Sequence, residues 1–564
     1  MLVLARRLCP RLKSGKDKLT QCARGTKALE RIIFMTAKVS VTMKLKNNFS
    51  PTAKRFICNG LALTLAAIIM RTVSVSFNAY VSAKIGAEGI GLFTLTMSIY
   101  GFAVTLATSG VNLACTALVA QALARTDKNS ALGALRCCIL YSLIFGAATS
   151  LLLWHGARFI GNVLLSDART VSSLRLLSVS MVPISLSSAF NGYFTAVRRV
   201  YKNACAQLFE QAVKIFLTVY ALSVLLPRGL EYSCLALVGG GAVAEFISFF
   251  FLFTEYLFDR HRHMPERWKK ASLPAPDMLA ISLPVAFSAY ARSALVTVEH
   301  ILIPRMLSLG GSSQSQALAS YGRLHSMSLP IIMYPMAAVS AFAGLLVPEF
   351  AEALTQKDDS RLSKMSSDAL HNTLLFSVCS SGVLIAFSRE LGTLIYSSHE
   401  VGKYITMLAP LIPVMYLDHI VDAMLKGMGK QVFSMIVNIT DSLLSIVLVC
   451  VILPRLGAEG YVYVIVIAEI FNFACSFTGL CNCVCLRFDF LRSLVIPLAA
   501  ILSSVTLCRR IFVYSAGVFS LVARICFCVS VYALLVFVSQ RLLPRKELSL
   551  STPRRIGNRI EKQA

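Results

Sequence analysis

The sequence is poor in charge, and poorest in acidic residues. Only 15% of its 564 residues are charged, whereas soluble domains carry about 25%. The 28 Asp and Glu are outnumbered by 55 Lys and Arg. Three stretches, 89–124, 137–157 and 324–348, contain no charged residue, and about 20 apolar residues suffice to cross a bilayer. These shortages exclude a soluble enzyme and a disordered protein. They predict an all-α polytopic membrane protein.

Signatures of other protein classes are also missing. The seventeen cysteines follow no disulfide spacing, and many lie in apolar runs, where cysteine packs as a small hydrophobe. The cluster Cys481, Cys483 and Cys485 lacks the spacing of a zinc site. No nucleotide-binding loop or metalloprotease motif is found, and long apolar runs exclude a transmembrane β-barrel. We therefore expect no metal, no cofactor and no enzymatic activity.

The excess of positive charge is concentrated at the two ends of the sequence. Residues 1–55 carry a net charge of +12 and residues 541–564 carry +5, out of +27 in total. Basic segments that flank apolar spans are typical of the cytoplasmic side of a membrane. We therefore interpret the charge as a topology signal and expect no binding to nucleic acid.

Hydropathy predicts about fourteen transmembrane helices. The loops on the side of the two basic tails are richer in Lys and Arg than the opposite loops, which predicts that both termini are cytoplasmic. The predicted spans are 56–82, 89–119, 131–154, 171–196, 203–226, 232–256, 278–304, 321–347, 368–388, 403–425, 432–453, 460–483, 491–508 and 513–540.

The first twelve spans show an internal repeat. Shifts of 221 to 231 residues place Arg71 on Arg292, Lys84 on Arg305, Glu210 on Asp441 and Glu245 on Glu469, in order along the chain. A six-span repeat keeps its membrane orientation, so the two halves form a parallel pseudo-repeat about an axis along the membrane normal. The predicted organisation is a basic tail (1–55), an N-lobe (56–256), a cytoplasmic linker (257–276), a C-lobe (277–486), two further helices (487–540) and a basic tail (541–564).

Several polar residues fall at bilayer depth, where a charge costs about 2.5–3.5 kcal/mol. Arg71 and Asn78 lie on one polar stripe of the first span. Arg292 and Glu299 share a face of the seventh span, about 10 Å apart by helical rise. We predict a central cavity between the lobes with both arginines facing it, because guanidinium groups suit phosphate or pyrophosphate. The alternative is that each arginine snorkels or pairs with a structural carboxylate.

The repeated acids allow two interpretations. Glu210 and Asp441 occupy matching places in spans 5 and 11, as do Glu245 and Glu469 in spans 6 and 12. They are candidates for coupling-ion or proton sites, and equally for hydrogen bonds that join the helices of each lobe. Because both lobes carry them, the structural role is favoured.

Several short segments occur in the order found in a known family. The sequence resembles the stage V sporulation protein B group of lipid II-type polysaccharide flippases, within the multidrug/oligosaccharidyl-lipid/polysaccharide exporter superfamily. The resemblance covers about residues 56–540. It is carried by Tyr80–Phe93, Ser187–Phe194, Gln207–Gln211, Ile303–Arg305, Leu346–Pro348, Leu408–Pro413 and Lys426–Gln431.

This resemblance implies a fourteen-helix, two-lobed alternating-access transporter in the bacterial cytoplasmic membrane. The implied substrate is an undecaprenyl-pyrophosphate-linked sugar, such as a lipid II-like peptidoglycan precursor or a polysaccharide unit, used in cell-wall or spore-cortex synthesis. Related lipid II flippases use cavity arginines, one of them in the first helix; Arg71 matches that type of position and Arg292 is a looser match. The candidate substrate-binding residues are Arg71, Arg292, Asn78, Glu299 and Arg305. The implied partners are the lipid-linked oligosaccharide, membrane lipids and cell-wall synthesis proteins. Alternatives are a multidrug/cation antiporter of the same superfamily, a membrane-embedded glycosyltransferase or a non-transporting scaffold.

Overall fold

The structure is a computed structural model that describes residues 51–108, 110–125, 127–263, 275–512, 517–542 and 548–549. It separates into two units, Met1–Ile69 and Met70–Ala564, and the contacts reported below lie within the second unit. Most of the basic tail 1–55, of the linker 257–276 and of the tail 541–564 falls outside the described residues. The proposed limits of the lobes therefore stay predictions.

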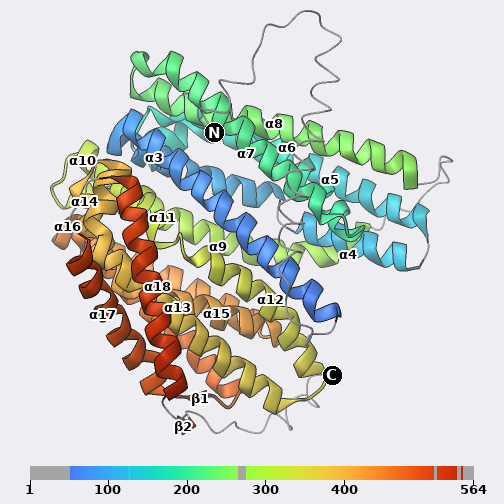
Figure 1. The fold of residues 1–564 in the computed structure, drawn as a ribbon. Coiled ribbons are helices and arrows are strands. Elements are labelled where there is room, and N and C mark those ends of the chain that lie inside the picture. Colours follow the sequence, from blue (N-terminus) through green and yellow to red (C-terminus); the bar gives the residue numbers. More distant parts are fainter. Residues whose placement is uncertain are drawn as a thin grey trace, which may run out of the picture. The chain divides into compact units, whose positions relative to one another are not determined.

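The described chain is almost entirely helical (Figure 1). Twelve of its helical segments are long and apolar enough to cross a membrane, which confirms the predicted polytopic helical membrane protein. The α-helices are α3 (Pro51–Thr108), α4 (Val111–Ala124), α5 (Lys128–Phe159), α6 (Thr170–Ala196), α7 (Val200–Leu225), α8 (Leu230–His263), α9 (Ala275–Leu309), α10 (Gln314–Tyr321), α11 (Leu329–Ile332), α12 (Met336–Thr355), α13 (Asp359–Tyr396), α14 (His399–Leu408), α15 (Ile412–Gly427), α16 (Gln431–Cys483), α17 (Ile496–Ile511) and α18 (Val518–Leu542).

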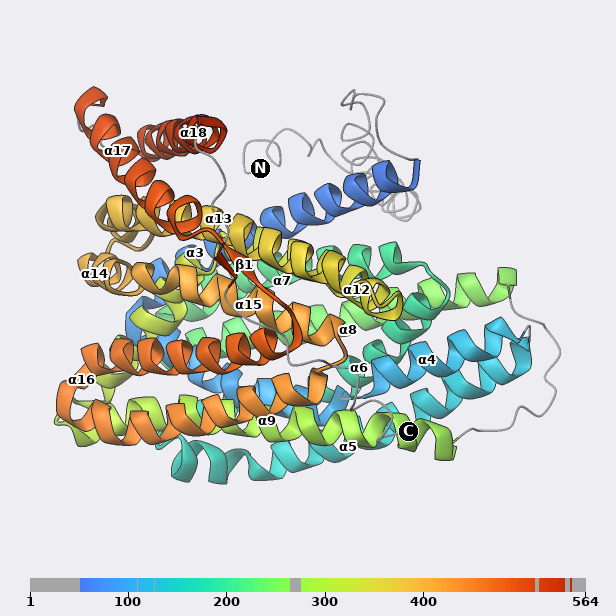
Figure 2. The ribbon, with the colours of Figure 1, turned by 90° about the horizontal axis from the view of Figure 1, so that it is seen from below.

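Two of the twelve segments each contain two predicted spans. Helix α16 has 53 residues, about 80 Å at 1.5 Å per residue, whereas the hydrocarbon core of a bilayer is about 30 Å thick. The chain turns at Gly457, whose φ of 62° is left-handed. A Cβ added at Gly479 would lie 2.3 Å from the Phe433 ring, so the two halves of α16 run back beside each other (Figure 2). Gly86, with φ 74°, divides α3 in the same way. Counting these halves separately gives fourteen spans.

Helix α6 is the centre of the N-lobe. It packs against α4, α5, α7 and α8, and its residues Phe190 and Tyr193 are buried in a cluster with α4, α5 and α8. The Ser185 hydroxyl bonds to the backbone oxygens of Ala107 and Ser142, at 2.8 and 2.7 Å. A serine oxygen so placed joins three helices without leaving an unsatisfied polar group in an apolar interior.

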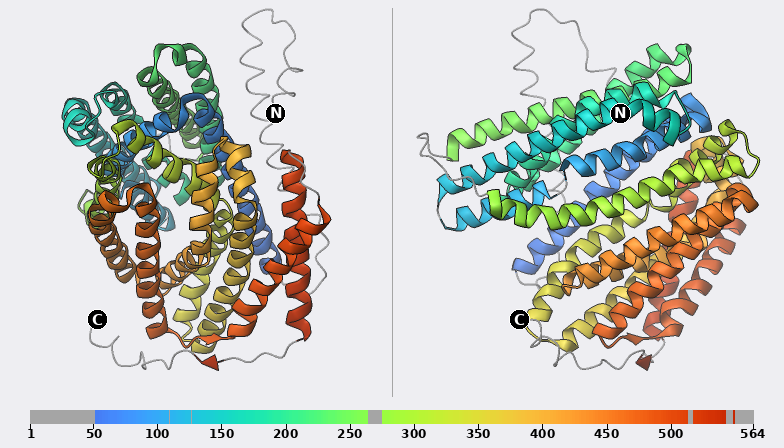
Figure 3. Two further views of the ribbon diagram at one scale, coloured as in Figure 1. Left: turned by 90° about the vertical axis from the view of Figure 1, so that its left-hand side faces the viewer. Right: turned by 180° about the vertical axis from the view of Figure 1, so that it is seen from behind.

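Helix α13 has the same position in the C-lobe. It packs against α12, α14, α15, α17 and α18, and α17 and α18 lie beside it in Figure 3. The buried Arg524 of α18 forms an ion pair with Glu390 of α13, with Nη1 and Oε1 3.5 Å apart. The two helices beyond the repeat are thus fixed to the C-lobe by apolar packing and by one buried charge pair.

Two regions depart from the simple pattern of one helix for each span. The predicted span 321–347 is built from α10, the π-helical segment η3 (Gly322–Ser328), α11 and α12, and non-α turns interrupt it around Pro330 and Pro335. Shorter irregular turns are η1 (Ile160–Leu164), η2 (Leu226–Arg228), η4 (Ala409–Leu411) and η5 (Leu491–Val495). Two short strands, β1 (Arg487–Phe488) and β2 (Leu548–Ser549), pair antiparallel with Arg487 opposite Ser549, so the C-terminal segment returns to the end of α16.

Candidate functional site

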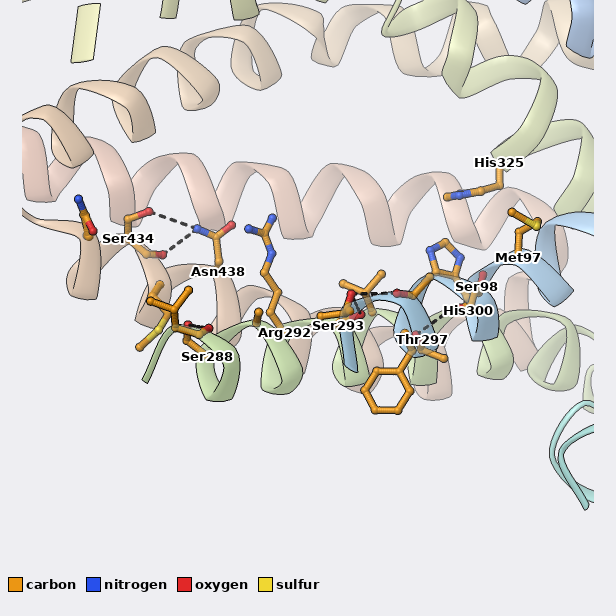
Figure 4. Close-up of a pocket in the computed structure, with 18 of the residues that line it drawn as sticks. Met97, Ser98, Ser288, Arg292, Ser293, Thr297, His300, His325, Ser434 and Asn438 are labelled. Atoms are coloured by element: carbon orange, nitrogen blue, oxygen red, sulfur yellow. Dashed lines mark hydrogen bonds between the residues drawn. The ribbon is translucent and has the colours of Figure 1, made fainter. Parts of the chain in front are cut away.

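A cavity of about 760 Å³ lies between α3 of the N-lobe and α9, η3, α15 and α16 of the C-lobe. Such a volume lies within the range of sites that bind small molecules and headgroups, about 300–1,000 Å³. Figure 4 shows its polar side chains on the facing helices. They are Thr94, Ser98 and Thr105 of α3, Ser288, Arg292, Ser293, Thr297 and His300 of α9, His325 of η3, Lys426 of α15, and Gln431, Ser434 and Asn438 of α16.

The ionisable groups on this cavity wall have one sign. Arg292 and Lys426 are cations, His300 and His325 can become cations, and the described lining includes no Asp or Glu. A low-dielectric cleft lined by one sign of charge concentrates ligands of the opposite sign. The geometry therefore favours an anionic ligand.

Arg292 is the cation placed most directly in the cavity. Its side chain rises from α9 toward Asn438 of α16 (Figure 4), and it forms no hydrogen bond or ion pair with any described residue that would neutralise it. Asp441, one turn further along α16, lies within electrostatic range. The planar guanidinium fork therefore remains free to bind two oxygens of a phosphate.

Lys426 marks the end of the cavity that lies near the turn between α15 and α16, where Lys426 and Gln431 are both exposed. Its Nζ lies 2.5 Å from Oδ2 of Asp422, one helical turn before it. Asp422 also accepts a hydrogen bond from the Ser434 hydroxyl. Asp422 does not line the cavity, but its carboxylate partly neutralises the Lys426 charge. Arg292, which has no such partner among the described residues, is therefore the stronger cation of the cavity.

Two histidines and a tyrosine cluster at the opposite end of the cavity. The rings of His300 and His325 meet edge to face, with centroids 4.4 Å apart. The Tyr321 hydroxyl and His300 Nδ1 are hydrogen-bonded at 2.7 Å, and the Tyr321 ring stacks on His325 at 5.4 Å. His325 Nδ1 is buried and has no hydrogen-bond partner among the described residues. A ligand can therefore complete this cluster from the cavity.

Arg71 and Asn78 lie outside the described lining of this cavity. Both are half-buried on the first half of α3. Asn78 donates a hydrogen bond to the backbone oxygen of Ser326, and Arg71 is within electrostatic range of Tyr396 and Tyr416. The Arg71 Nε is buried without a partner in the described chain. The structure thus places the two predicted arginines in different surroundings.

The N-lobe acids gather in the lobe interior. Glu245 of α8 accepts a hydrogen bond from the Tyr100 hydroxyl of α3, and its Oε2 is buried without a partner among described residues. Glu210 and Lys214 of α7 lie within electrostatic range of Glu245. One lysine thus accompanies two carboxylates, which fits the predicted joining of helices by polar groups.

The C-lobe acids gather in the same manner. Asp441 and Glu469, from the two halves of α16, lie within electrostatic range of each other. Glu299 of α9 is within range of Asp441 but does not line the described cavity. Arg305, further along α9, is exposed and outside the described lining as well. The acids thus lie behind the cavity wall, and the cations lie on it.

Beyond the histidines, the two lobes are joined by polar contacts that we call the closed-end contact. Arg169, just before α6, bonds to Asp167 and Glu88, at 2.7 and 2.9 Å. Glu88 in turn accepts a hydrogen bond of 2.8 Å from the Ser315 hydroxyl of α10, and Gln314 Nε2 donates to the Ser166 backbone oxygen at 2.8 Å. Hydrogen bonding to Asp167, with a contribution from Glu88, raises the pKa of Arg169 above its usual range, so this charge persists at all ordinary pH values.

Two glycines allow the backbones to meet beneath these loops. A Cβ on Gly91 of α3 would lie 2.1 Å from the Leu318 carbonyl oxygen of α10, and a Cβ on Gly322 would lie 2.4 Å from that of Ala87. Real Cβ contacts under 3.0 Å essentially do not occur. The glycine pair therefore lets α3 and α10 seal this end of the cavity by direct backbone contact.

Sequence reasoning placed Arg292 at bilayer depth but did not single out the histidines, Lys426 or the hydroxyl groups of α3. One signal was available for α3. Thr94, Ser98, Gly101 and Thr105 recur every three or four residues in a run without charge, which is the spacing of one helical face. No comparable pattern joins His300 to His325, because they come from different helices.

The sequence family described as "Polysaccharide biosynthesis protein" matches residues 56–354. The chain belongs to this family. The MatE family also matches residues 291–451. The family membership and the helical fold together identify a multi-pass bacterial membrane protein, and they confirm the resemblance to flippases of the exporter superfamily.

Two curated relatives come from Bacillus subtilis (strain 168). The chain is 26% identical to "Stage V sporulation protein B" over 421 residues, covering 73% of this chain and 80% of the relative. It is 22% identical to "Lipid II flippase MurJ" over 424 residues, covering 71% and 77%.

Solved structures share the fold. The structure titled "Lipid II flippase MurJ, inward closed conformation" matches with a TM-score of 0.66 at 13% identity, covering 85% of this chain and 99% of that one. An inward-facing multidrug resistance MATE family transporter matches with a TM-score of 0.60 at 14% identity, covering 74% and 96%. At these identities the likeness concerns the fold alone.

Proposed function

We propose that this protein is a flippase that translocates an undecaprenyl-pyrophosphate-linked sugar across the cytoplasmic membrane, in cell-wall or spore-cortex synthesis. The observation that carries the proposal is the cavity between the lobes, which presents Arg292, Lys426 and two histidines and no described carboxylate. The two relatives named a sporulation protein and a lipid II flippase support the choice of a lipid-linked precursor.

The cavity suggests how the headgroup is held. In the proposed mechanism it enters at the Lys426 end, Arg292 binds the pyrophosphate through its planar fork, and hydroxyl groups of α3 and α9 bond to the sugar. The lipid tail stays in the bilayer. The closed-end contact must then break so that the opposite end opens, which is an alternating-access cycle. Because the N-lobe and C-lobe meet there through Gly91 and a few polar bonds, this seam is the proposed moving part.

The remaining predicted residues receive roles in the same proposal. Arg71, with its unpartnered Nε, binds the pyrophosphate after the closed end has opened, on the same helix as Asn78. Glu299, Asp441 and Glu469 are candidates for carboxylates that respond to a coupling ion behind the Arg292 wall. Glu210 and Glu245 join helices within the N-lobe, and Arg305 interacts with phospholipid headgroups.

The proposed orientation has both termini in the cytoplasm. Under it, the Lys426 end of the cavity faces the cytoplasm, where lipid-linked precursors are made, and the closed-end contact faces outward. The basic loops support this orientation through the positive-inside rule. Cell-wall synthesis proteins are the proposed partners on either side of the membrane.

A multidrug/cation antiporter is the second candidate, because MATE transporters share the fold. Such a transporter needs acidic side chains on the wall that meets a cationic drug. Here the described acids, among them Asp441 and Glu469, lie inside the lobes, whereas the lining carries Arg292. The polarity of the cavity therefore favours the flippase.

Substitution of Arg292 tests the proposal. The full-length protein is reconstituted in liposomes, and translocation of fluorescent lipid II is compared with that of a cationic dye. Arg292→Ala is expected to lower the lipid II rate at least tenfold, because a charge-assisted hydrogen bond contributes about 1.5–3 kcal/mol. Arg292→Lys should keep part of the rate because it keeps the charge without the fork. Arg158→Ala, at an exposed arginine of α5, is the matched control. Dye transport without lipid II transport would overturn the proposal in favour of the antiporter.

A further inference from the structure

The histidine cluster is not needed to hold a pyrophosphate, because it lies too far from the arginine that does so. Arg292 and His300 are eight residues apart on α9, about 12 Å by helical rise. The Arg292 side chain is directed toward Asn438 of α16 and not along α9 toward His300 (Figure 4), so we do not expect a pyrophosphate held by Arg292 to occupy the histidine end as well. The closed end of the cavity therefore meets another part of the headgroup.

We propose that His300 and His325 form a second, pH-sensitive oxyanion subsite, which takes an acidic group of the headgroup while Arg292 takes the pyrophosphate. The inference rests on the proposed function and names the substrate class more narrowly: a lipid-linked headgroup with a carboxylate or a further phosphate remote from its pyrophosphate. A headgroup of neutral sugars alone lacks such a group.

The hydrogen bonding of the cluster allows a change of protonation. A tyrosine hydroxyl both donates and accepts, so Tyr321 can donate to neutral His300 Nδ1 and accept from it when the imidazole is protonated, at the same distance of 2.7 Å. His325 lines the cavity, and its Nδ1 is buried and has no partner in the described chain. A rotation of the imidazole ring would bring this nitrogen to a ligand oxygen in the cavity.

The electrostatic surroundings make the proton follow the ligand. Two imidazole rings with centroids 4.4 Å apart do not readily carry a positive charge at the same time in an apolar interior, because the two charges repel each other and each loses its hydration. On α9, Arg292 repels a second cation; Glu299 lies off the cavity lining but within electrostatic range of Tyr321, so it favours a single proton on the pair. On η3, Arg323 is paired with Glu400. Tyr321 of α10 and Tyr461 of α16 are neutral phenols. The residues of α3 that line the cavity are uncharged, and Glu88 of α3 is paired with Arg169. With no anion on the described lining of the cavity, we expect the pair to be neutral, and an oxyanion that enters the cavity favours uptake of one proton by the pair.

Proton binding and anion binding must then strengthen each other by the same factor, because linkage is reciprocal. An acidic headgroup should bind more tightly as the pH falls, down to the pH at which its own carboxylate is protonated. A headgroup without the acidic group should show little change, because its pyrophosphate binds to a guanidinium that stays charged.

The test measures binding to the full-length protein in nanodiscs between about pH 8 and pH 5.5, which brackets the ordinary imidazole range. The probes are lipid II, whose peptide carries free carboxylates, and the same pyrophosphate-linked disaccharide without its peptide. Lipid II is expected to bind about tenfold more tightly at the lower pH, with proton uptake detected by calorimetry in two buffers of different ionisation enthalpy. The second probe should change less than twofold.

Variants separate this inference from the proposed function. His300→Gln/His325→Gln should abolish the pH dependence and the proton uptake with lipid II, and so reduce the difference in affinity between lipid II and the peptide-free lipid at low pH. His155→Gln, at an exposed histidine of α5, is the matched control and should retain both. Equal pH dependence for the two probes, or a double variant that keeps it, would overturn the subsite alone. Failure of both lipids to bind in an Arg292-dependent manner would overturn the proposed function.

Discussion

Gly91→Ala should open the closed end of the cavity. The added Cβ would lie 2.1 Å from the Leu318 carbonyl oxygen, and a backbone atom cannot rotate away as a side chain can. The α3 and α10 backbones must separate by about 1 Å to restore a normal contact. Overpacking of this kind costs about 1–3 kcal/mol, and the cost applies only while the contact is closed. At about 2 kcal/mol, the balance between closed and open forms shifts about thirtyfold.

Hydrogen exchange measures this shift directly. Amides of α10 exchange through opening of the seam, so their rates should rise by about the same thirtyfold in the nanodisc-reconstituted variant. Gly344→Ala is the control, because a Cβ there meets nothing within 4 Å and it adds the same methyl group and helix propensity. Exchange in α10 equal to that of the wild type, in a variant with unchanged yield and thermal stability, would refute the idea that the backbone contact holds this end shut.

Two further predictions concern the ion pair between α18 and α13 and the first turn of α5. Arg524→Leu should lower the thermal stability of the purified protein, because it leaves the half-buried Glu390 carboxylate without its partner; the cost of breaking a fully buried pair, about 3–5 kcal/mol, is the upper limit. Arg524→Leu/Glu390→Gln should recover most of the loss, and no difference between the two variants would contradict the pairing. Asp127 caps α5, and bonding to the Ser130 hydroxyl lowers the pKa of its carboxyl. The ionised carboxylate should therefore cap the helix above about pH 4, and the cap should be lost as the pH falls further and the carboxyl is protonated. Amide exchange in the first turn of α5 should then speed up at low pH in the wild type. In Asp127→Ala it should be fast at every pH.

The fold could be predicted largely from the sequence because the bilayer imposes it. Apolar runs of about twenty residues have few alternatives to a spanning helix, and the left-handed Gly457 falls in the loop predicted between spans 11 and 12. The irregular span at 321–347 could be anticipated only in part. Pro330 and Pro335 are residues that interrupt helices, whereas nothing in the local sequence shows that Gly322, where the π-helical turn begins, lies against Ala87 of α3.

The candidate site was predictable only in part, for a physical reason. Periodicity shows which face of a helix a residue occupies, and the depth of Arg292 made it a candidate. It does not show which helix lies opposite. Arg71 occupies the matching place in the predicted repeat, yet it lies within electrostatic range of Tyr396 of α13 and Tyr416 of α15. His325 of η3 meets His300 of α9 although 25 residues separate them in the chain. Tertiary contact, not local pattern, brings those groups together.

The turn at Gly457 has a consequence for the biosynthesis of the protein. The two halves of α16 are joined by one residue with non-helical backbone angles, which leaves no loop long enough to let the translocation machinery release one span before it receives the next. We therefore expect them to leave the translocon together as a helical hairpin. A residue with a Cβ at this position favours a continuous helix that is far too long for the membrane, so the error would arise at insertion, before any transport step could be affected.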